Sequence, residues 1–228
     1  MSAEPAIDGA SIVLVGEFRT GLYQPAWFAR HDLIRDEEAE DAEMLLLQEH
    51  TVEDTENQPG ITSFSIGALS FHVQNDKFIA RTDDPSEFRP LLDLVLGTFR
   101  IVEATPLDAL GMNRKTHVEL PEDKLWTTVM DSLVPTEPWS ESLDEPHALT
   151  TTIRGERDKP EVAYVQTKVE PSTKIEDGIY VEINQHVDTA ELDEETGPFD
   201  YLEEDWISAL DFAAQLRDHL VVDALDEE

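Results

Sequence analysis

Residues 61–82, ITSFSIGALSFHVQNDKFIART, decide which kind of fold this chain adopts. On either side of Gly67, apolar and polar residues alternate, as in a strand with one buried face. The alternation changes phase there, because Phe71 falls out of step with Phe64, and a bulge or a tight turn at the glycine explains the change. A second turn then precedes another strand at residues 77–82. The stretch predicts antiparallel strands joined by short turns.

A helix with one apolar face is predicted directly after these strands. Its apolar residues recur at helical spacing and are Leu91, Leu92, Val95, Leu96, Phe99 and Val102. Proline is tolerated only in the first turn of a helix, so Pro90 places the start of this helix near Arg89. Upstream, residues 11–18 are rich in β-branched side chains and predict a buried strand. Pro25 marks the start of a short helix.

Residues 36–48 predict another helix. Acidic residues stand at its start, where they suit the positive end of the helix dipole. Its apolar residues also recur at helical spacing, at Ala39, Ala42, Leu45 and Leu46.

The same order of elements is predicted again in the second half of the chain. The predicted elements are a strand at 111–120, a helix at 121–134, strands at 149–154, 161–169 and 178–186, and a closing helix at 205–224. We therefore expect an α+β fold of two tandem modules over residues 1–104 and 105–228. Each module has a strand, a helix, antiparallel strands and a helix, with the helices packed on antiparallel sheet. A single helix-grip-like domain, with one curved sheet around the last helix, is the alternative.

The net charge of the chain is extreme. It contains 51 Asp and Glu against 16 Lys and Arg, which gives a charge of −35 on 25.7 kDa. The acids are spread along the chain rather than gathered in one tail, so they indicate adaptation to the solvent more than a binding device. Molar salt screens such repulsion, because the Debye length falls to about 3 Å at 1 M. This composition resembles that of proteins from halophiles with molar internal salt, such as haloarchaea, and we expect such a source.

Several classes of protein are excluded by what the sequence lacks. It has no cysteine, so there is no disulfide framework, thiol nucleophile or cysteine zinc site. It has no Walker A loop, G-x-G-x-x-G turn, G-x-S-x-G elbow or H-E-x-x-H motif, so we expect no cofactor and no metal. No apolar run is long enough for a membrane span, and the amino terminus lacks the features of a signal peptide. We expect a cytoplasmic protein, or one packed inside an assembly built in the cytoplasm.

Two segments of the second half depart from the general acidity. Between Arg154 and Lys174 there are five cations and four acids, and residues 113–117 contain no acid. Both segments lie on predicted strands, so we expect them to share a sheet and to form a binding surface. The candidate binding residues are Arg114, Lys115, His117, Arg154, Arg157, Lys168, Lys174, Asn184 and His186. The alternative interpretation is that the cations pair with their own acids, since exposed ion pairs are common and contribute only about 0–1 kcal/mol each.

Several short segments look like parts of a family of conserved prokaryotic proteins of unknown function. They are residues 11–18 with 24–28, residues 109–114, residues 169–172 and residues 184–186. The resemblance spans most of the chain and implies one conserved architecture. It implies no activity, cofactor or site residue.

Two functional interpretations follow from these patterns. The first is a non-catalytic interaction or assembly module, whose partner is a protein (a second copy or a different chain) bound around Arg114 and residues 154–174. The second is a small-ligand-binding protein or hydrolase-type enzyme with a pocket between the two halves. Its candidate acid–base residues are His117, Glu170, Glu182 and His186. The absence of catalytic motifs favours the first interpretation, and the net charge disfavours a nucleic-acid partner.

Overall fold

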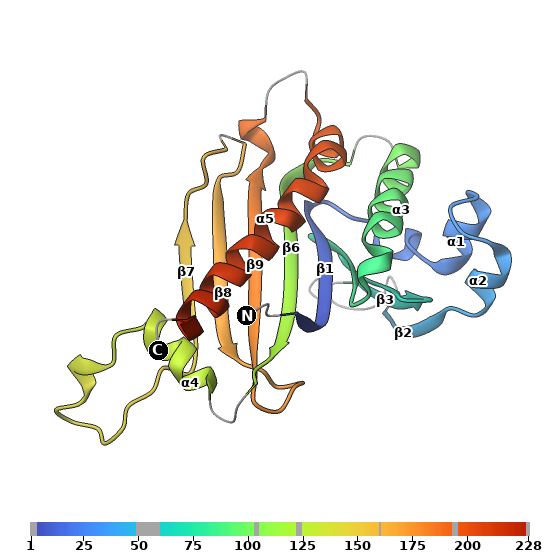
Figure 1. Cartoon of the computed structure of the whole chain (residues 1–228). Helices are drawn as coiled ribbons and strands as arrows, with labels where there is room; N and C mark the ends of the chain where they lie inside the picture. Colours follow the sequence, from blue (N-terminus) through green and yellow to red (C-terminus); the bar gives the residue numbers. More distant parts are fainter. Residues whose placement is uncertain are drawn as a thin grey trace, which may run out of the picture. The chain divides into compact units, whose positions relative to one another are not determined.

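The structure is a computed structural model that describes residues 4–48, 60–102, 105–121, 125–159, 161–192 and 196–226. Within these residues the chain is α+β, with nine strands and five α-helices (Figure 1). The strands are β1 (Pro5–Gly16), β2 (Glu43–Gln48), β3 (Ile61–Ile66), β4 (Leu69–Gln74), β5 (Lys77–Thr82), β6 (Leu107–Glu119), β7 (Thr151–Gly155), β8 (Tyr164–Pro171) and β9 (Gly178–Asp188). The helices are α1 (Pro25–Arg30), α2 (Asp36–Glu40), α3 (Phe88–Ile101), α4 (Leu125–Leu133) and α5 (Pro198–Asp226). The α+β class predicted from the sequence is confirmed.

All nine strands belong to one sheet, in the order β2-β3-β4-β5-β1-β6-β9-β8-β7. The neighbouring pairs with a defined register are antiparallel; between β4 and β5, for example, Phe71 faces Ala80. The two halves of the chain use the same strand order, because β3-β4-β5-β1 in the first half corresponds to β7-β8-β9-β6 in the second. The edges of the sheet are β2 and β7.

The chain divides into two compact units, each built from separate segments. Unit 1 contains residues 1–9, 113–186 and 207–228, and unit 2 contains residues 10–112 and 187–206. Strands β1, β6 and β9 and helix α5 contribute residues to both units. The tandem division at residue 104 stays a prediction.

The core of unit 2 is a cluster of aromatic side chains. Alternate residues of β3, β4 and β5 are buried, which places Phe64, Phe71 and Phe78 on one face of the strands. The rings of Phe64 and Phe71 stack with centroids 4.9 Å apart. Phe78 meets Phe99 of α3 edge to face, with centroids 5.1 Å apart. Helix α3 therefore packs on this face, and burial of the rings supplies much of the stability of the unit.

The stretch at residues 61–82 folds as its pattern predicts. Gly67 lies in the two-residue turn between β3 and β4, where its φ of +56° favours glycine. Helix α3 begins at Phe88, so Pro90 falls in its first turn. Helix α1 begins at Pro25, as expected.

The helix predicted at residues 36–48 is wrong in its second part. Helix α2 ends at Glu40, and β2 begins at Glu43 and pairs antiparallel with β3. The apolar run at residues 44–47 is too short for its periodicity to separate a helix from a strand. Antiparallel pairing with β3 makes this run a strand and not a helix.

The predicted elements of the second half are present with shifted ends. Strand β6 begins earlier than predicted, and α5 begins at Pro198 rather than at residue 205. The helix predicted at residues 121–134 is present as α4, and residues 122–124 of that prediction lie outside the described residues. Neither α5 nor any other described helix is long and apolar enough to cross a membrane.

Candidate functional site

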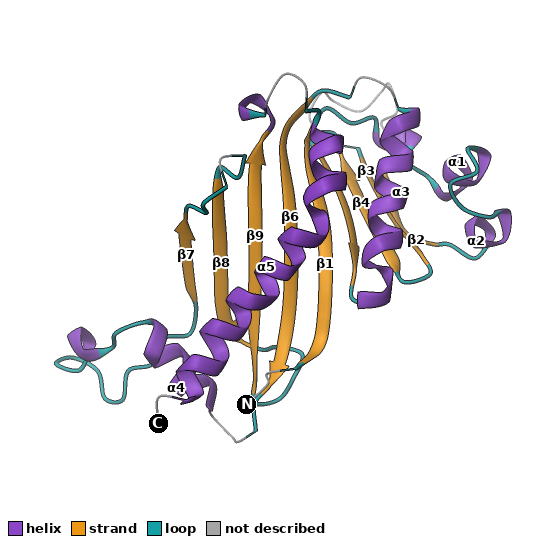
Figure 2. Ribbon diagram, turned by 45° about the horizontal axis from the view of Figure 1, so that its top comes forward, coloured by secondary structure: helices purple, strands orange, loops and turns teal. Residues whose placement is uncertain are grey.

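The sheet of unit 1 has two faces of different character. Every second residue of β9 is buried, so Val181 and Ile183 point to one face and Glu182 points to the other. Helix α5 covers the first of these faces, which we call the inner face. Here Gln185 Nε2 donates a hydrogen bond to the carbonyl oxygen of Ala209 at 2.7 Å. Figure 2 shows α5 crossing the strands of this unit.

The opposite face, which we call the outer face, carries six of the nine candidate residues. The register places side chains of β8 directly opposite those of β9, with Tyr164 facing His186 and Lys168 facing Glu182. Strand alternation and side-chain contacts add residues of β6 and β7. The outer face consists of Lys115, His117, Glu119, Thr152, Arg154, Tyr164, Gln166, Lys168, Glu170, Tyr180, Glu182, Asn184 and His186.

Both described helices of unit 1 lie on the inner side. Leu133 of α4 joins Phe212 and Leu216 of α5 in lining a cavity next to β7 and β8. Among the described residues of unit 1, no helix therefore covers the outer face. Its charged side chains Lys115, Lys168 and Glu182 are partly exposed, whereas His117 is buried.

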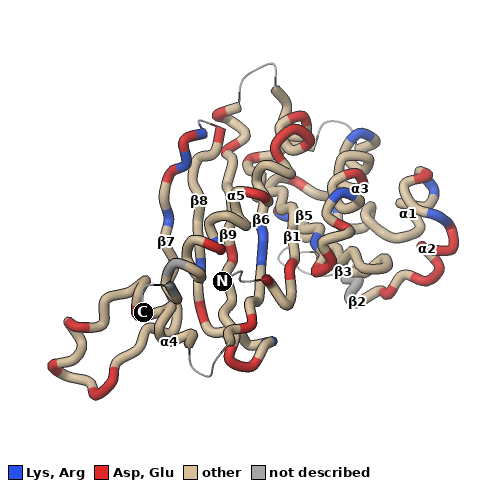
Figure 3. The backbone as a smooth tube through the Cα atoms, in the orientation of Figure 1, with Lys and Arg blue, Asp and Glu red and all other residues tan. Residues whose placement is uncertain are grey.

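Positive and negative groups balance on the outer face. Lys115 Nζ lies 3.1 Å from Glu182 Oε1, and Lys168 Nζ lies 2.7 Å from Glu170 Oε1. These side chains are 28–42% exposed, where one ion pair contributes about 0–1 kcal/mol. Both lysines thus pair with acids of their own chain, as the alternative interpretation expected. With Arg154 and Glu119, the face carries three cations and three carboxylates, and Figure 3 shows the basic residues on β6 and β7.

Aromatic rings organise the rest of the outer face. Tyr164 stacks on His186 with centroids 4.5 Å apart and 17° between the ring planes. The guanidinium carbon of Arg154 lies 3.5 Å from the centre of the Tyr164 ring, in cation–π contact. The ring centroid of Tyr180 lies 4.8 Å from that of His117. Each tyrosine therefore holds a basic side chain in place.

His117 is fixed by the connection between β8 and β9. Its Nδ1 lies 2.7 Å from the Ser172 hydroxyl oxygen, and its ring is buried. The same oxygen accepts hydrogen bonds from the backbone N–H groups of Lys174 and Ile175, at 3.1 Å and 2.9 Å. Lys174 thus belongs to this connection and not to a strand of the outer face.

One polar atom of the outer face lacks a partner within the described residues. Oδ1 of Asn184 is buried and accepts no hydrogen bond there, although Gln166 faces Asn184 in the register. A buried acceptor without a donor costs about 1–3 kcal/mol. The atom is enclosed by the chain itself, so it is not an acceptor that a partner reaches from the surface.

Arg114 and Arg157 lie on the inner face. Neighbouring residues of a strand point to opposite faces, so Arg114 and Lys115 cannot share one surface. Arg114 Nη1 donates to the carbonyl oxygen of Leu210 at 2.8 Å. The Arg157 guanidinium carbon lies 4.2 Å from the centre of the Phe212 ring. Both cations contact α5, which separates them from the other candidates.

Tyr164 and Gln166 are outer-face residues that charge and composition did not single out. Their signal lies in the alternation of residues 161–169, which gives Lys168 the same orientation as both of them. Pairing the face of β8 that carries Lys168 with the face of β9 that carries His186 would have identified both residues.

A cavity of about 310 Å³ lies on the inner side, next to β7, β8 and α5. Its apolar lining comprises Leu133, Ile153, Val165, Val169, Phe212, Leu216 and Leu220. All lining residues belong to the second half of the chain. The cavity is therefore not the pocket between halves that a ligand-binding protein was expected to have.

Within the described residues, no three His, Asp or Glu side chains come together in a way that would hold a metal ion. No protein-family model matches this chain, and no curated protein is significantly similar to it. The resemblance of its short segments to uncharacterised prokaryotic proteins stays a prediction. Because these comparisons give no function, the functional interpretation of this chain rests on the geometry of the outer face.

Proposed function

We propose that this chain is a non-catalytic protein-interaction or assembly module from a halophilic source, either a haloarchaeon or a virus of haloarchaea. A partner protein binds its outer face. The observation that carries the proposal is the charge of that face, with three cations and three carboxylates in a chain of charge −35. Most of the chain repels another acidic protein, but this face does not.

A further property of the outer face supports a protein partner. Tyrosines are enriched in protein interfaces, and Tyr164 and Tyr180 present rings held by neighbouring side chains. We place the module in the cytoplasm or in an assembly built there, because the molar salt inside a halophile screens the repulsion of a chain with charge −35.

Charge reversal on the outer face tests the proposal. In the double variant Lys115→Glu, Lys168→Glu, the face holds five carboxylates and one cation, so it repels an acidic partner. We expect retrieval of the partner from native lysate in about 2 M KCl to fall at least about tenfold. Circular dichroism should stay unchanged, since both side chains are partly exposed.

The matched control changes two cations of β5 in unit 2. Lys77→Glu, Arg81→Glu alters the net charge by the same amount on another strand. We expect the control to retrieve the partner as the wild type does. Full retrieval by the outer-face variant, or no retrieved protein with the wild type, overturns the proposal.

A small-ligand-binding protein is the second candidate, because the cavity of about 310 Å³ has the size of known ligand sites. Its apolar lining indicates a neutral, apolar ligand. Such a ligand would be displaced by Val165→Trp, which fills the cavity with an indole. Binding of a neutral apolar dye that this substitution abolishes would support the candidate, and absence of dye binding to the wild type would reject it.

We also propose that the two halves are tandem modules with a boundary near residue 104. The equal strand order of the halves supports this, and the single helix-grip-like domain is the alternative. Aligned homologous sequences in which the buried positions of the two halves match would support a duplication. Unrelated patterns in the two halves would contradict it.

A further inference from the structure

Strand β7 is an edge of the sheet, and no other strand of the described residues pairs with its free side. Its neighbour in the sheet is β8, and Ile153 in its middle is 63% exposed. Natural edges are protected by charged side chains, proline, bulges or a covering element. The one charged residue of β7, Arg154, lies over the ring of Tyr164 on β8. The side chains of β7 therefore leave its free edge open to pairing.

The same edge lets two copies of this acidic chain approach each other. Residues 146–155 contain no Asp or Glu, although the chain contains 51 of them. Two molecules of charge −35 repel, and contacts that bring their carboxylates together are unfavourable. Pairing along β7 brings no carboxylates of the strand together.

We propose that two copies of this chain pair antiparallel along β7, about a two-fold axis at Ile153. The inference rests on the proposed function, because it names a second copy as one protein that the module binds. In this register Ile153 faces Ile153 of the second copy, Thr152 faces Arg154, and Thr151 faces Gly155. No like charges face each other, so the edge is complementary to itself. A two-fold contact of this kind is closed, so association ends at a dimer.

Pairing also covers apolar surface on the inner side. Ile153 lines the cavity together with Phe212 and Leu216. In the dimer the two Ile153 side chains lie side by side, next to the apolar linings of both copies. On the other side, the Thr152–Arg154 pairs join the two outer faces into one continuous surface.

A single introduced cysteine tests the pairing without background, because the chain has no cysteine of its own. In Ile153→Cys the two thiols lie across the axis on residues whose Cβ atoms are about 4.5–5.5 Å apart, so an approach of about 1 Å brings them within the range of a disulfide. We expect mild oxidation in about 2 M KCl to give a covalent dimer. The matched control is Leu45→Cys on β2, the other edge, where Leu45 is 60% exposed. We expect the control to form no covalent dimer, because its thiols lie away from the paired edge.

Light scattering of the full chain gives the second measurement. We expect the unmodified protein to have twice the mass of 25.7 kDa in molar KCl. The variant Ile153→Lys should be a monomer with unchanged circular dichroism, and Leu45→Lys should stay a dimer. A wild type that is monomeric at all concentrations, or equal cross-linking through Leu45→Cys, overturns the dimer.

The two proposals fail in different ways. A monomer that still retrieves a partner through the outer face overturns the β7 dimer and leaves the proposed function standing. A dimer that retrieves no other protein overturns the binding of a partner at the outer face and supports the pairing of β7.

Discussion

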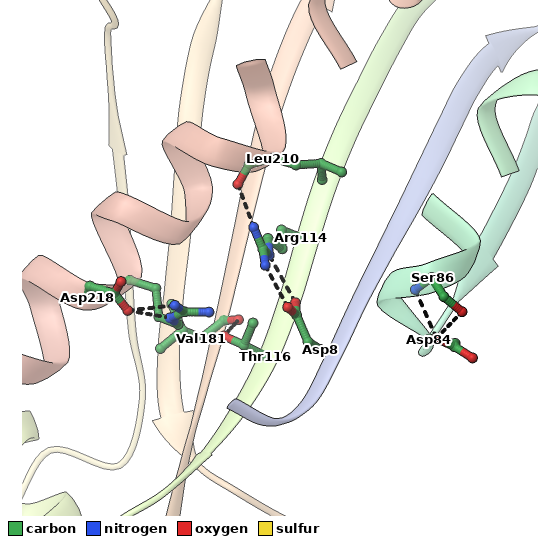
Figure 4. Close-up of polar contacts among 9 residues, drawn as sticks. Asp8, Asp84, Ser86, Arg114, Thr116, Val181, Leu210 and Asp218 are labelled. Atoms are coloured by element: carbon green, nitrogen blue, oxygen red, sulfur yellow. Dashed lines mark hydrogen bonds and ion pairs between the residues drawn. The ribbon is translucent and has the colours of Figure 1, made fainter. Parts of the chain in front are cut away.

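Arg114 binds Asp8 through two hydrogen bonds, from Nε to Oδ1 at 2.9 Å and from Nη2 to Oδ2 at 2.5 Å (Figure 4). The guanidinium also donates to the carbonyl oxygen of Leu210 on α5. The two side chains are only 15% and 9% exposed, unlike the ion pairs of the outer face. This pair therefore ties β1, β6 and α5 of unit 1 together.

We predict that Arg114→Ala lowers the free energy of unfolding by about 3 kcal/mol, because it leaves the Asp8 carboxylate buried without its partner. Urea denaturation in molar KCl measures the loss. The control is Arg89→Ala, which breaks the exposed pair between Arg89 and Asp93 and should cost at most about 0.5 kcal/mol. Equal losses in the two variants would show that the buried pair contributes no more to the free energy of unfolding than an exposed pair does.

Trp206 and Trp139 should differ sharply in their contribution to stability. Trp206 is fully buried, and its Nε1 donates to the carbonyl oxygen of Phe88 at 3.0 Å. Trp206→Phe should cost about 2 kcal/mol, because the carbonyl loses its donor and the smaller ring leaves a void. Trp139 is 59% exposed, so Trp139→Phe should change stability by less than about 0.5 kcal/mol. Thermal unfolding of both variants under the same salt conditions measures the two losses of stability. Equal losses would contradict the prediction.

The turn at Gly67 gives a test of backbone conformation. Gly67 has a φ of +56°, and an added Cβ would meet no atom within 4 Å. Gly67→Ala should therefore destabilise through backbone strain alone, by about 1 kcal/mol. Gly21 has equal space and no positive φ, so Gly21→Ala should be neutral or slightly stabilising. The difference in denaturation midpoint between the variants is the measurement, and identical midpoints would contradict the assignment.

Burial raises the pKa of Tyr23 to about 12, although a hydrogen bond with Thr105 works in the opposite direction. An unfolded tyrosine titrates near pH 10. The buried neutral phenol therefore contributes stability that is complete below pH 10 and is lost as the pH rises from about 10 to about 12. Ultraviolet titration should show one late-ionising tyrosine, which disappears in Tyr23→Phe. If Tyr23→Phe instead removes a tyrosine that ionises near pH 10, the hydroxyl of Tyr23 is not buried.

The sequence predicts local structure well where turn chemistry and alternation agree. The phase change at Gly67 and the position of Pro90 fix the strands and the helix around them, because both residues permit few backbone conformations. Residues 36–48 show the limit of periodicity. There the leucines around Leu45 fit a helix or a strand, and only pairing with β3, which is distant in sequence, decides between them.

The candidate site was predictable in part. Alternation along β9 gives Glu182 and His186 one common face. Alternation also separates Arg114 from Lys115, so charge alone could not define one surface. The facing pairs depend on the register of β8 against β9, and Asp8 lies in the part of β1 that precedes the predicted strand. Register is set by the assembled sheet, which local patterns do not specify.

Unfolding measured across a KCl series is the most direct test of the claim that the carboxylates suit ion-rich surroundings. With a charge of −35, the chain should unfold cooperatively only at molar KCl, and its melting temperature should fall steeply as the salt is diluted. A chain that stays compact and melts cooperatively at millimolar ionic strength would contradict the claim. The acid excess would then be a recognition device. The balance of charges on the outer face would in that case no longer identify it as the binding surface.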